Sequence, residues 1–130
     1  MKKHDLIKLA QSAREKAYAP YSEFKVGAAL LTSNGKVFTG TNVENASYGL
    51  TICAERVAVC KAVSEGEKDF KTIAVVGSSE GLVFPCGACL QVLAEFSDRL
   101  NVLVTDKDNN IEEYNIKELL PKCFSVENRR

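Results

Sequence analysis

The sequence predicts a three-layer α/β domain with a mixed five-stranded sheet, and three observations indicate this fold class. Apolar residues repeat at helical spacing near the N-terminus, short β-branched segments follow, and these alternate with further helical segments. Strands that alternate with helices usually form a sheet with helices on both faces. With 130 residues, the chain is expected to form one domain, residues 1–130, around a single core.

The N-terminal part is expected to form an amphipathic helix and then a hairpin. Apolar residues of the helix share one face, polar residues occupy the other, and Pro20 ends the pattern. These apolar positions are Leu6, Ile7, Ala10, Ala13 and Ala17. Residues 24–32 are typical of a strand, the turn signal at residues 33–35 follows, and residues 36–40 are expected to pair back.

The second half is expected to alternate helices with strands. Residues 41–52 have no clear period and are expected to form a loop, which ends where Cys53 begins a helix that runs to about Ser64. Pro85 favours a helix start at the next residue. The other expected elements are a strand at 72–77, a helix at 86–96, a strand at 101–105, a last strand after the turn at 108–110, and a short helix at 116–120.

Composition and charge argue against several classes of function. The 17 basic and 17 acidic residues cancel, whereas a protein that wraps nucleic acid usually carries a basic excess. No segment has the length of a membrane span, and no signal peptide begins the sequence. Five cysteines without a secretory signal favour metal binding or catalysis in a reducing compartment. We therefore expect a cytoplasmic protein that acts on a small neutral molecule, without nucleic-acid or membrane partners.

Three cysteines and one glutamate form the most informative pattern. Cys86 and Cys89, three residues apart at a predicted helix start, face the same way and can hold one ion, with Cys53 as a third ligand. Zinc with three protein ligands keeps its fourth position open for water, as catalytic zinc sites do. Glu55 can then act as a general base on that water, provided that Cys53 lies in the cap or first turn of its helix.

The charge of such a site and its missing fourth ligand each need an explanation. Three thiolates and Zn²⁺ carry one net negative charge, which two helix N-termini and Arg56 can balance, although a solvated Arg56 is an equal alternative. A closed structural site would need a fourth protein ligand. His4 is expected at a frayed end and Cys60 two helical turns beyond Cys53. The sequence leaves Cys123 as an alternative fourth ligand. The favoured interpretation is a site with three protein ligands and a fourth position for water.

These motifs resemble those of one family. Cys53-Ala54-Glu55 with Pro85-Cys86-x-x-Cys89, together with the segment 40–47, resembles the zinc-dependent cytidine deaminases, specifically the short type that assembles as homotetramers. The resemblance covers nearly the whole chain. It implies a cytidine deaminase-like α/β/α fold, one zinc ion per subunit, and hydrolytic deamination of cytidine and deoxycytidine. Glu55 would move the protons between the water, the ring nitrogen and the leaving ammonia.

The resemblance also implies roles for residues that the motifs alone leave ambiguous. Asn42 and Glu44 would bind the ribose hydroxyls, and the Ala54 N–H would hold the base carbonyl. Phe24 would flank the pyrimidine ring, while Tyr48 and Phe124 would act across the subunit interface. Two departures from the family pattern stand out. Leu90 occupies a place where related chains often carry arginine, and Lys122-Cys123 replaces the small residues expected before Phe124.

Three other functions compete with nucleoside deamination. A deaminase of a cytosine-containing antibiotic of the blasticidin type shares the metal motif, but Asn42 and Glu44 favour a nucleoside. A non-catalytic zinc-binding module would use a fourth protein ligand. Editing of RNA or DNA is disfavoured by the neutral charge and by cysteine as the first ligand at position 53.

Overall fold

The computed structural model describes residues 1–126 and contains the predicted mixed five-stranded sheet, in the order β2-β1-β3-β4-β5. The strands are β1 (Val26–Thr32), β2 (Val37–Thr41), β3 (Phe70–Gly77), β4 (Asn101–Thr105) and β5 (Ile111–Asn115). The helices are α1 (Lys3–Arg14), the short 3₁₀ helix η1 (Tyr48–Leu50), α2 (Ala54–Ser64), α3 (Gly87–Phe96) and α4 (Ile116–Leu119). Only the β3–β4 pair is parallel, and the helix α3 lies in the crossover between these two strands.

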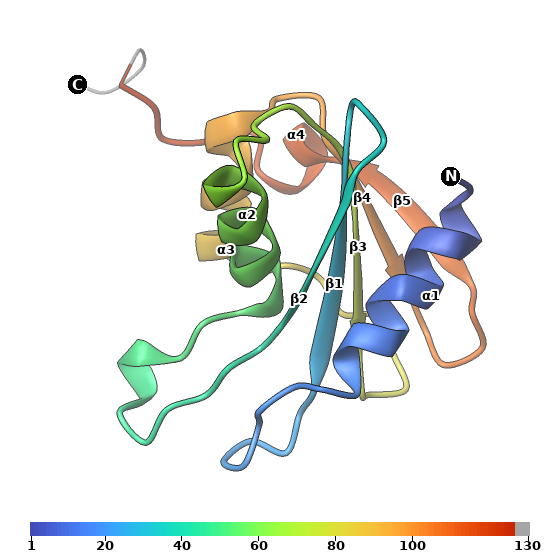
Figure 1. Ribbon diagram of the computed structural model, residues 1–130, viewed down its shortest axis with the longest axis vertical. Helices are drawn as coiled ribbons and strands as arrows, with labels where there is room; N and C mark the ends of the chain where they lie inside the picture. The colour runs from blue at the N-terminus through green and yellow to red at the C-terminus, as the bar shows by residue number, and fades with distance from the viewer. Residues whose placement is uncertain (127–130) are drawn as a thin grey trace.

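Helices cover both faces of the sheet, which confirms the three-layer fold class. Figure 1 shows α1 on one face, and α2 and α3 together on the other. Side chains along β1 alternate accordingly: Ala28 and Leu30 pack in the core under α2 and α3, whereas Ala29 and Leu31 pack in the core under α1. Both faces of β1 are therefore buried, and the helices that carry the cysteines are fixed against one face of the sheet.

Two glycines let helices approach the sheet very closely. A Cβ atom added to Gly27 would lie 2.0 Å from the carbonyl oxygen of Ala10 in α1. A Cβ added to Gly40 in β2 would lie 2.3 Å from the carbonyl oxygen of Ala54 and 2.6 Å from the nitrogen of Ala58. Only glycine fits at such distances. Gly40 therefore sets how deeply the first turn of α2 sits on the sheet.

The prediction that the first helix continues toward Pro20 is wrong, because α1 ends at Arg14. Backbone pairing explains the early end: the Tyr18 N–H donates to the Asn42 carbonyl at 3.1 Å, and the Tyr18 carbonyl accepts from the Glu44 N–H at 2.9 Å. These bonds draw the chain away from the helix axis. Strand β1 likewise begins at Val26 and not at residue 24.

The segment between β2 and α2 is a loop, as expected, but it has internal order. Val43 pairs with Ile52 in an antiparallel bridge, and η1 lies between them. Figure 1 shows this segment extending away from the sheet on the side of α2. Within residues 1–126, no helix has both the length and the apolar character needed to cross a membrane.

Candidate metal centre and substrate cavity

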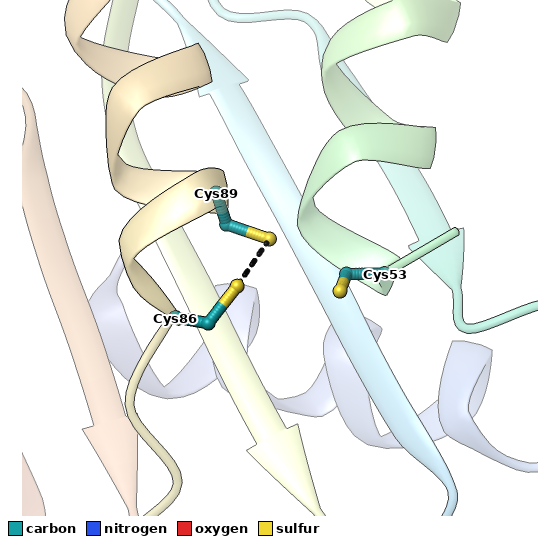
Figure 2. Close-up of side chains that lie close together, drawn as sticks. All are labelled: Cys53, Cys86 and Cys89. Atoms are coloured by element: carbon teal, nitrogen blue, oxygen red, sulfur yellow. Dashed lines mark hydrogen bonds between the residues drawn. The ribbon is translucent and has the colours of Figure 1, made fainter. Parts of the chain in front are cut away.

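Three cysteines from two neighbouring helices meet in one cluster. Cys53 is the N-cap residue of α2, Cys86 is the N-cap residue of α3, and Cys89 lies in the first turn of α3. Figure 2 shows the three sulfurs in the space between the two helices. The three Sγ atoms all lie within 4.8 Å of one another, and the Cys86 thiol donates to the Cys89 sulfur at 3.6 Å. Tetrahedral zinc with Zn–S bonds of ~2.3 Å requires sulfurs roughly 3.8 Å apart, so the donor set fits this ion.

The surroundings of the cluster favour negative charge on sulfur. Both helix N-termini point their partial positive charge toward it, and Arg56 Nη2 donates to Cys53 Sγ at 3.3 Å. Hydrogen bonds from Cys89 and then from Arg56 lower the pKa of Cys53 to about 5. The hydrogen bond to Cys53 and then burial raise the pKa of Cys89, so Cys89 keeps its proton more readily than Cys53 does.

A second nitrogen of the Arg56 guanidinium, Nε, is buried and has no hydrogen-bond partner among the described residues. A buried N–H group of this kind is costly unless an acceptor faces it. The Nη2 atom of the same guanidinium donates to Cys53 Sγ, so the Arg56 side chain is directed at the cluster. The arrangement supports the charge-balancing interpretation of Arg56 over the solvated one.

Glu55 lies in the first turn of α2, two residues after Cys53, and is only 5 % exposed. Burial raises the pKa of its carboxyl group to about 7, and the negative charge on Cys53 adds to the effect. A carboxyl group with this pKa can both accept and release a proton near neutral pH, as a general acid–base catalyst must. Helix α2 thus presents a candidate metal ligand and a candidate proton carrier at the same end.

A cavity of about 270 Å³ opens beside this cluster. The predicted site residues that line it are Phe24, Asn42, Glu44, Cys53, Ala54, Glu55 and Cys86. Two further predicted site residues, Cys89 and Arg56, are outside this lining. The cavity therefore brings the sugar-binding, base-binding and proton-transfer candidates together with two of the three thiols.

Asn42 and Glu44 also organise the rim of the cavity. Asn42 Oδ1 accepts from the Val26 N–H at 2.9 Å, and Asn42 Nδ2 donates to the Phe24 carbonyl at 2.8 Å. Glu44 accepts from the N–H groups of Tyr21 and Ser22 at 2.9 and 3.1 Å, and also from the Ser22 hydroxyl. The Ser22 hydroxyl and these backbone bonds lower the pKa of Glu44. Both residues thus hold the segment that carries Phe24.

Two predicted substrate residues lie away from this cavity. Tyr48, in η1, is 73 % exposed, and its ring packs on that of Tyr21 with centroids 5.9 Å apart. Phe124, near the C-terminal end of the described residues, is 63 % exposed. Within this chain the structure does not bring either ring to the cavity lining.

Sequence reasoning did not select five further residues that line the cavity: Ser22, Val26, Thr51, Val83 and Phe84. Phe84 immediately precedes the Pro85-Cys86 motif, and its ring packs on Tyr114 with centroids 5.6 Å apart. Ser22 lies two positions before the predicted site residue Phe24, which is the one local signal for its place in the cavity. The others needed the three-dimensional arrangement.

The remaining candidate ligands are outside the cluster. Among residues 1–126, the cysteine and carboxylate groups close enough to hold one ion are Cys53, Cys86 and Cys89, without Cys123. Cys60 is exposed on α2, and His4 is exposed in α1. Leu90 is 7 % exposed and packs in the core under α2 and α3, so this position serves packing.

Comparisons with known proteins agree with this geometry. The family described as "Cytidine and deoxycytidylate deaminase zinc-binding region" matches residues 1–105. A cytidine deaminase of Halalkalibacterium halodurans is 52% identical over 128 residues, which cover 98% of this chain and 97% of that protein. A crystal structure of cytidine deaminase from Burkholderia pseudomallei has a TM-score of 0.92 at 52% identity, covering 95% of this chain and 100% of that one. A blasticidin-S deaminase of Bacillus cereus is 32% identical over 129 residues, or 92% of this chain and 91% of its own.

Proposed function

This chain belongs to the cytidine and deoxycytidylate deaminase family, and from that premise we propose that it hydrolyses cytidine and deoxycytidine to uridine and deoxyuridine with release of ammonia. One observation carries the proposal: the buried Glu55 lines the same cavity as two thiols of a three-cysteine cluster. A structural zinc site has no use for a proton carrier with an open cavity beside it. Relatives and fold both support the deaminase over the zinc-binding module.

The chemistry needs an activated water and a group that moves protons. Zinc held by Cys53, Cys86 and Cys89 would act as a Lewis acid that lowers the pKa of a water molecule. The Glu55 carboxylate then takes a proton from the water and delivers it to the ring nitrogen next to the amino-bearing carbon. The Glu55 carboxylate then takes the second proton of the same water molecule and gives it to the departing amino group. One water is consumed and one ammonia leaves.

The rim residues keep hydrogen-bonding capacity for the sugar. The amide of Asn42 uses one lone pair and one hydrogen inside the protein, which leaves one of each for a ribose hydroxyl. The carboxylate of Glu44 accepts three hydrogen bonds from the segment 21–22 and has one acceptor position left. The Ala54 N–H, in the first turn of α2, faces no i−4 partner and is suited to hold the base carbonyl.

We also infer that the enzyme acts as a homotetramer in which subunits contribute to one another's cavities. Support comes from aromatic rings that a monomer leaves exposed, Tyr48 and Phe124, and from the apolar Leu50 beside Tyr48, which is 66 % exposed. Exposed apolar side chains that cluster on one segment are typical of an interface.

The three metal-binding thiols must remain reduced, which supports a cytoplasmic location.

Ultraviolet absorbance of nucleoside solutions tests the proposed function. Zinc-loaded protein is expected to remove the cytosine band of cytidine and of deoxycytidine, with one ammonia released per base. Blasticidin S is the matched comparison, because it carries the same cytosine without the ribose hydroxyls. Turnover of blasticidin S alone would replace the nucleoside with the antibiotic, and no turnover of any of the three would favour the binding module. Sedimentation of an active monomer would remove the shared-cavity arrangement.

A further inference from the structure

The side chain of Gln91 makes a two-way contact with the backbone of Phe124. Its Nε2 donates to the Phe124 carbonyl oxygen at 2.7 Å, and its Oε1 accepts from the Phe124 N–H at 3.3 Å. A primary amide that pairs with both groups of one residue reproduces the exchange of hydrogen bonds between two paired strand residues. The contact therefore fixes both the position and the orientation of the backbone at Phe124.

Gln91 belongs to the helix that carries two of the three thiols. It follows Cys89 by two residues in α3, and the side chains of Cys89 and Leu90 are both buried. This part of α3 is packed on the core and cannot shift without disturbing the metal centre. The backbone of Phe124 is thus attached to a helix that is packed on the core and carries two of the clustered cysteines.

The ring of Phe124 is presented outward while its backbone is held. The side chain is 63 % exposed, and it is absent from the lining of the cavity in its own chain. Ordering a backbone around an exposed aromatic ring costs conformational entropy and gains little within one chain. A ring held in this way is suited to contact a second molecule.

We propose that Gln91 is a positioning residue for substrate binding, which holds Phe124 so that its ring closes over the cavity of a second copy of this chain. The inference rests on the proposed function, in which subunits of a homotetramer contribute to one another's cavities. Gln91 itself touches neither substrate nor metal. It acts by fixing where the ring lies relative to the metal-carrying helix.

The hydrogen-bond pattern defines the variants that test this role. Gln91→Met keeps the length and the apolar stem of the side chain but removes both hydrogen bonds. Gln91→Glu keeps an acceptor for the Phe124 N–H but places a carboxylate against the Phe124 carbonyl. Gln11→Met is the matched control, because Gln11 on α1 also donates from Nε2, to Asn109 Oδ1 at 3.0 Å, on the opposite face of the sheet.

Steady-state kinetics and amide exchange read out the two parts of the proposal. Gln91→Met is expected to raise KM for cytidine roughly tenfold, as the loss of one or two hydrogen bonds predicts, with kcat and zinc content nearly unchanged. Hydrogen exchange of the Phe124 amide, followed by mass spectrometry of the C-terminal peptide, should become faster in Gln91→Met and Gln91→Glu. Gln11→Met should leave both quantities at their wild-type values.

A double variant separates positioning from general stability. If Gln91 acts through the Phe124 ring, Gln91→Met combined with Phe124→Ala will have the KM of Phe124→Ala alone. The proposal would be overturned if the fold-increase in KM of the double variant equalled the product of the two single fold-increases. Unchanged hydrogen exchange of the Phe124 amide in Gln91→Met would also overturn it. Absence of turnover in the wild type would contradict the proposed function, and the exchange data would still decide whether Gln91 holds the segment.

Discussion

Arg56 Nη2 lies 3.3 Å from Cys53 Sγ, so a guanidinium three residues further along the chain donates directly to a sulfur of the proposed metal site. The remaining charge on the site is the reason for this contact. Three thiolates exceed the charge of Zn²⁺ by one, and excess negative charge makes a water molecule harder to deprotonate. The contact between Arg56 and Cys53 therefore connects the sequence of α2 with the reactivity of the metal centre.

Replacing Arg56 should weaken catalysis while the metal remains bound. Arg56→Gln removes a charged hydrogen bond and is expected to lower kcat roughly tenfold or more, because such bonds contribute about 1.5–3 kcal/mol. Arg56→Lys restores the charge without the planar fork and should recover part of the loss. Turnover per bound zinc is the measurement. Equal turnover of Arg56→Gln and the wild type would return Arg56 to the role of a solvated helix charge.

Replacing any of the three clustered cysteines should remove the metal. Cys53→Ser, Cys86→Ser and Cys89→Ser each leave two thiolates, and elemental analysis is expected to show loss of zinc from all three purified proteins. Cys60→Ser is the control, since Cys60 is exposed on the same helix as Cys53 but outside the cluster. Full zinc occupancy in one of the three variants would remove that cysteine from the ligand set.

The bond between Ser22 and Glu44 should set the acid limit of substrate binding. The hydroxyl of Ser22 lowers the pKa of Glu44, so the carboxylate persists, and its contribution to binding and stability is lost only as pH falls through that lowered value. Ser22→Ala is expected to move the pKa of Glu44 back toward its ordinary value. The pH at which KM for cytidine rises should move upward with it. An NMR titration of the Glu44 side chain that is identical in both proteins would contradict this account.

Local sequence signals predicted the fold well where a contact lies within one element or between neighbours. The i, i+3 spacing of Cys86 and Cys89 and the cap position of Cys53 follow from helix geometry, and both were confirmed. The early end of α1 could not be predicted in this way. The backbone of Tyr18 pairs with Asn42 and Glu44, more than twenty residues away, and this pairing overrides the helical spacing of Ala17.

The candidate site shows the same division between local and distant information. Motif spacing selected Cys86 with Cys89 and Cys53 with Glu55, because the members of each pair are close in sequence. That the two pairs meet, across 33 positions from Cys53 to Cys86, followed from the chemistry of cysteine as a zinc ligand and from the family resemblance. The side chain of Asn42 also hydrogen-bonds the backbone of Phe24 and of Val26, and no pattern in the neighbouring sequence predicts these two contacts. Nor does any such pattern predict the contact between Gln91 and Phe124, which spans 33 positions and joins a helix to a segment without regular structure.

Gly40 should be intolerant of even one methyl group. In Gly40→Ala the new Cβ would lie 2.3 Å from the Ala54 carbonyl oxygen, so α2 must move away from the sheet. We expect a loss of about 1–3 kcal/mol in the free energy of unfolding, as for other overpacked sites. Gly49→Ala is the control, because no heavy atom lies within 4 Å of its added Cβ. Calorimetry that shows equal stability for both variants would contradict the close approach of β2 and α2.

The most direct test of the central claim is the turnover of cytidine by zinc-loaded Glu55→Ala beside the wild type. Glu55 is the buried carboxyl group of the cavity, with a pKa raised to about 7, and it is assigned every proton transfer of the reaction. The account predicts that the variant retains its zinc but loses at least ~10²–10⁴-fold in kcat, the usual contribution of general acid–base catalysis. Near-normal turnover by the zinc-loaded variant would contradict the claim that Glu55 carries these protons.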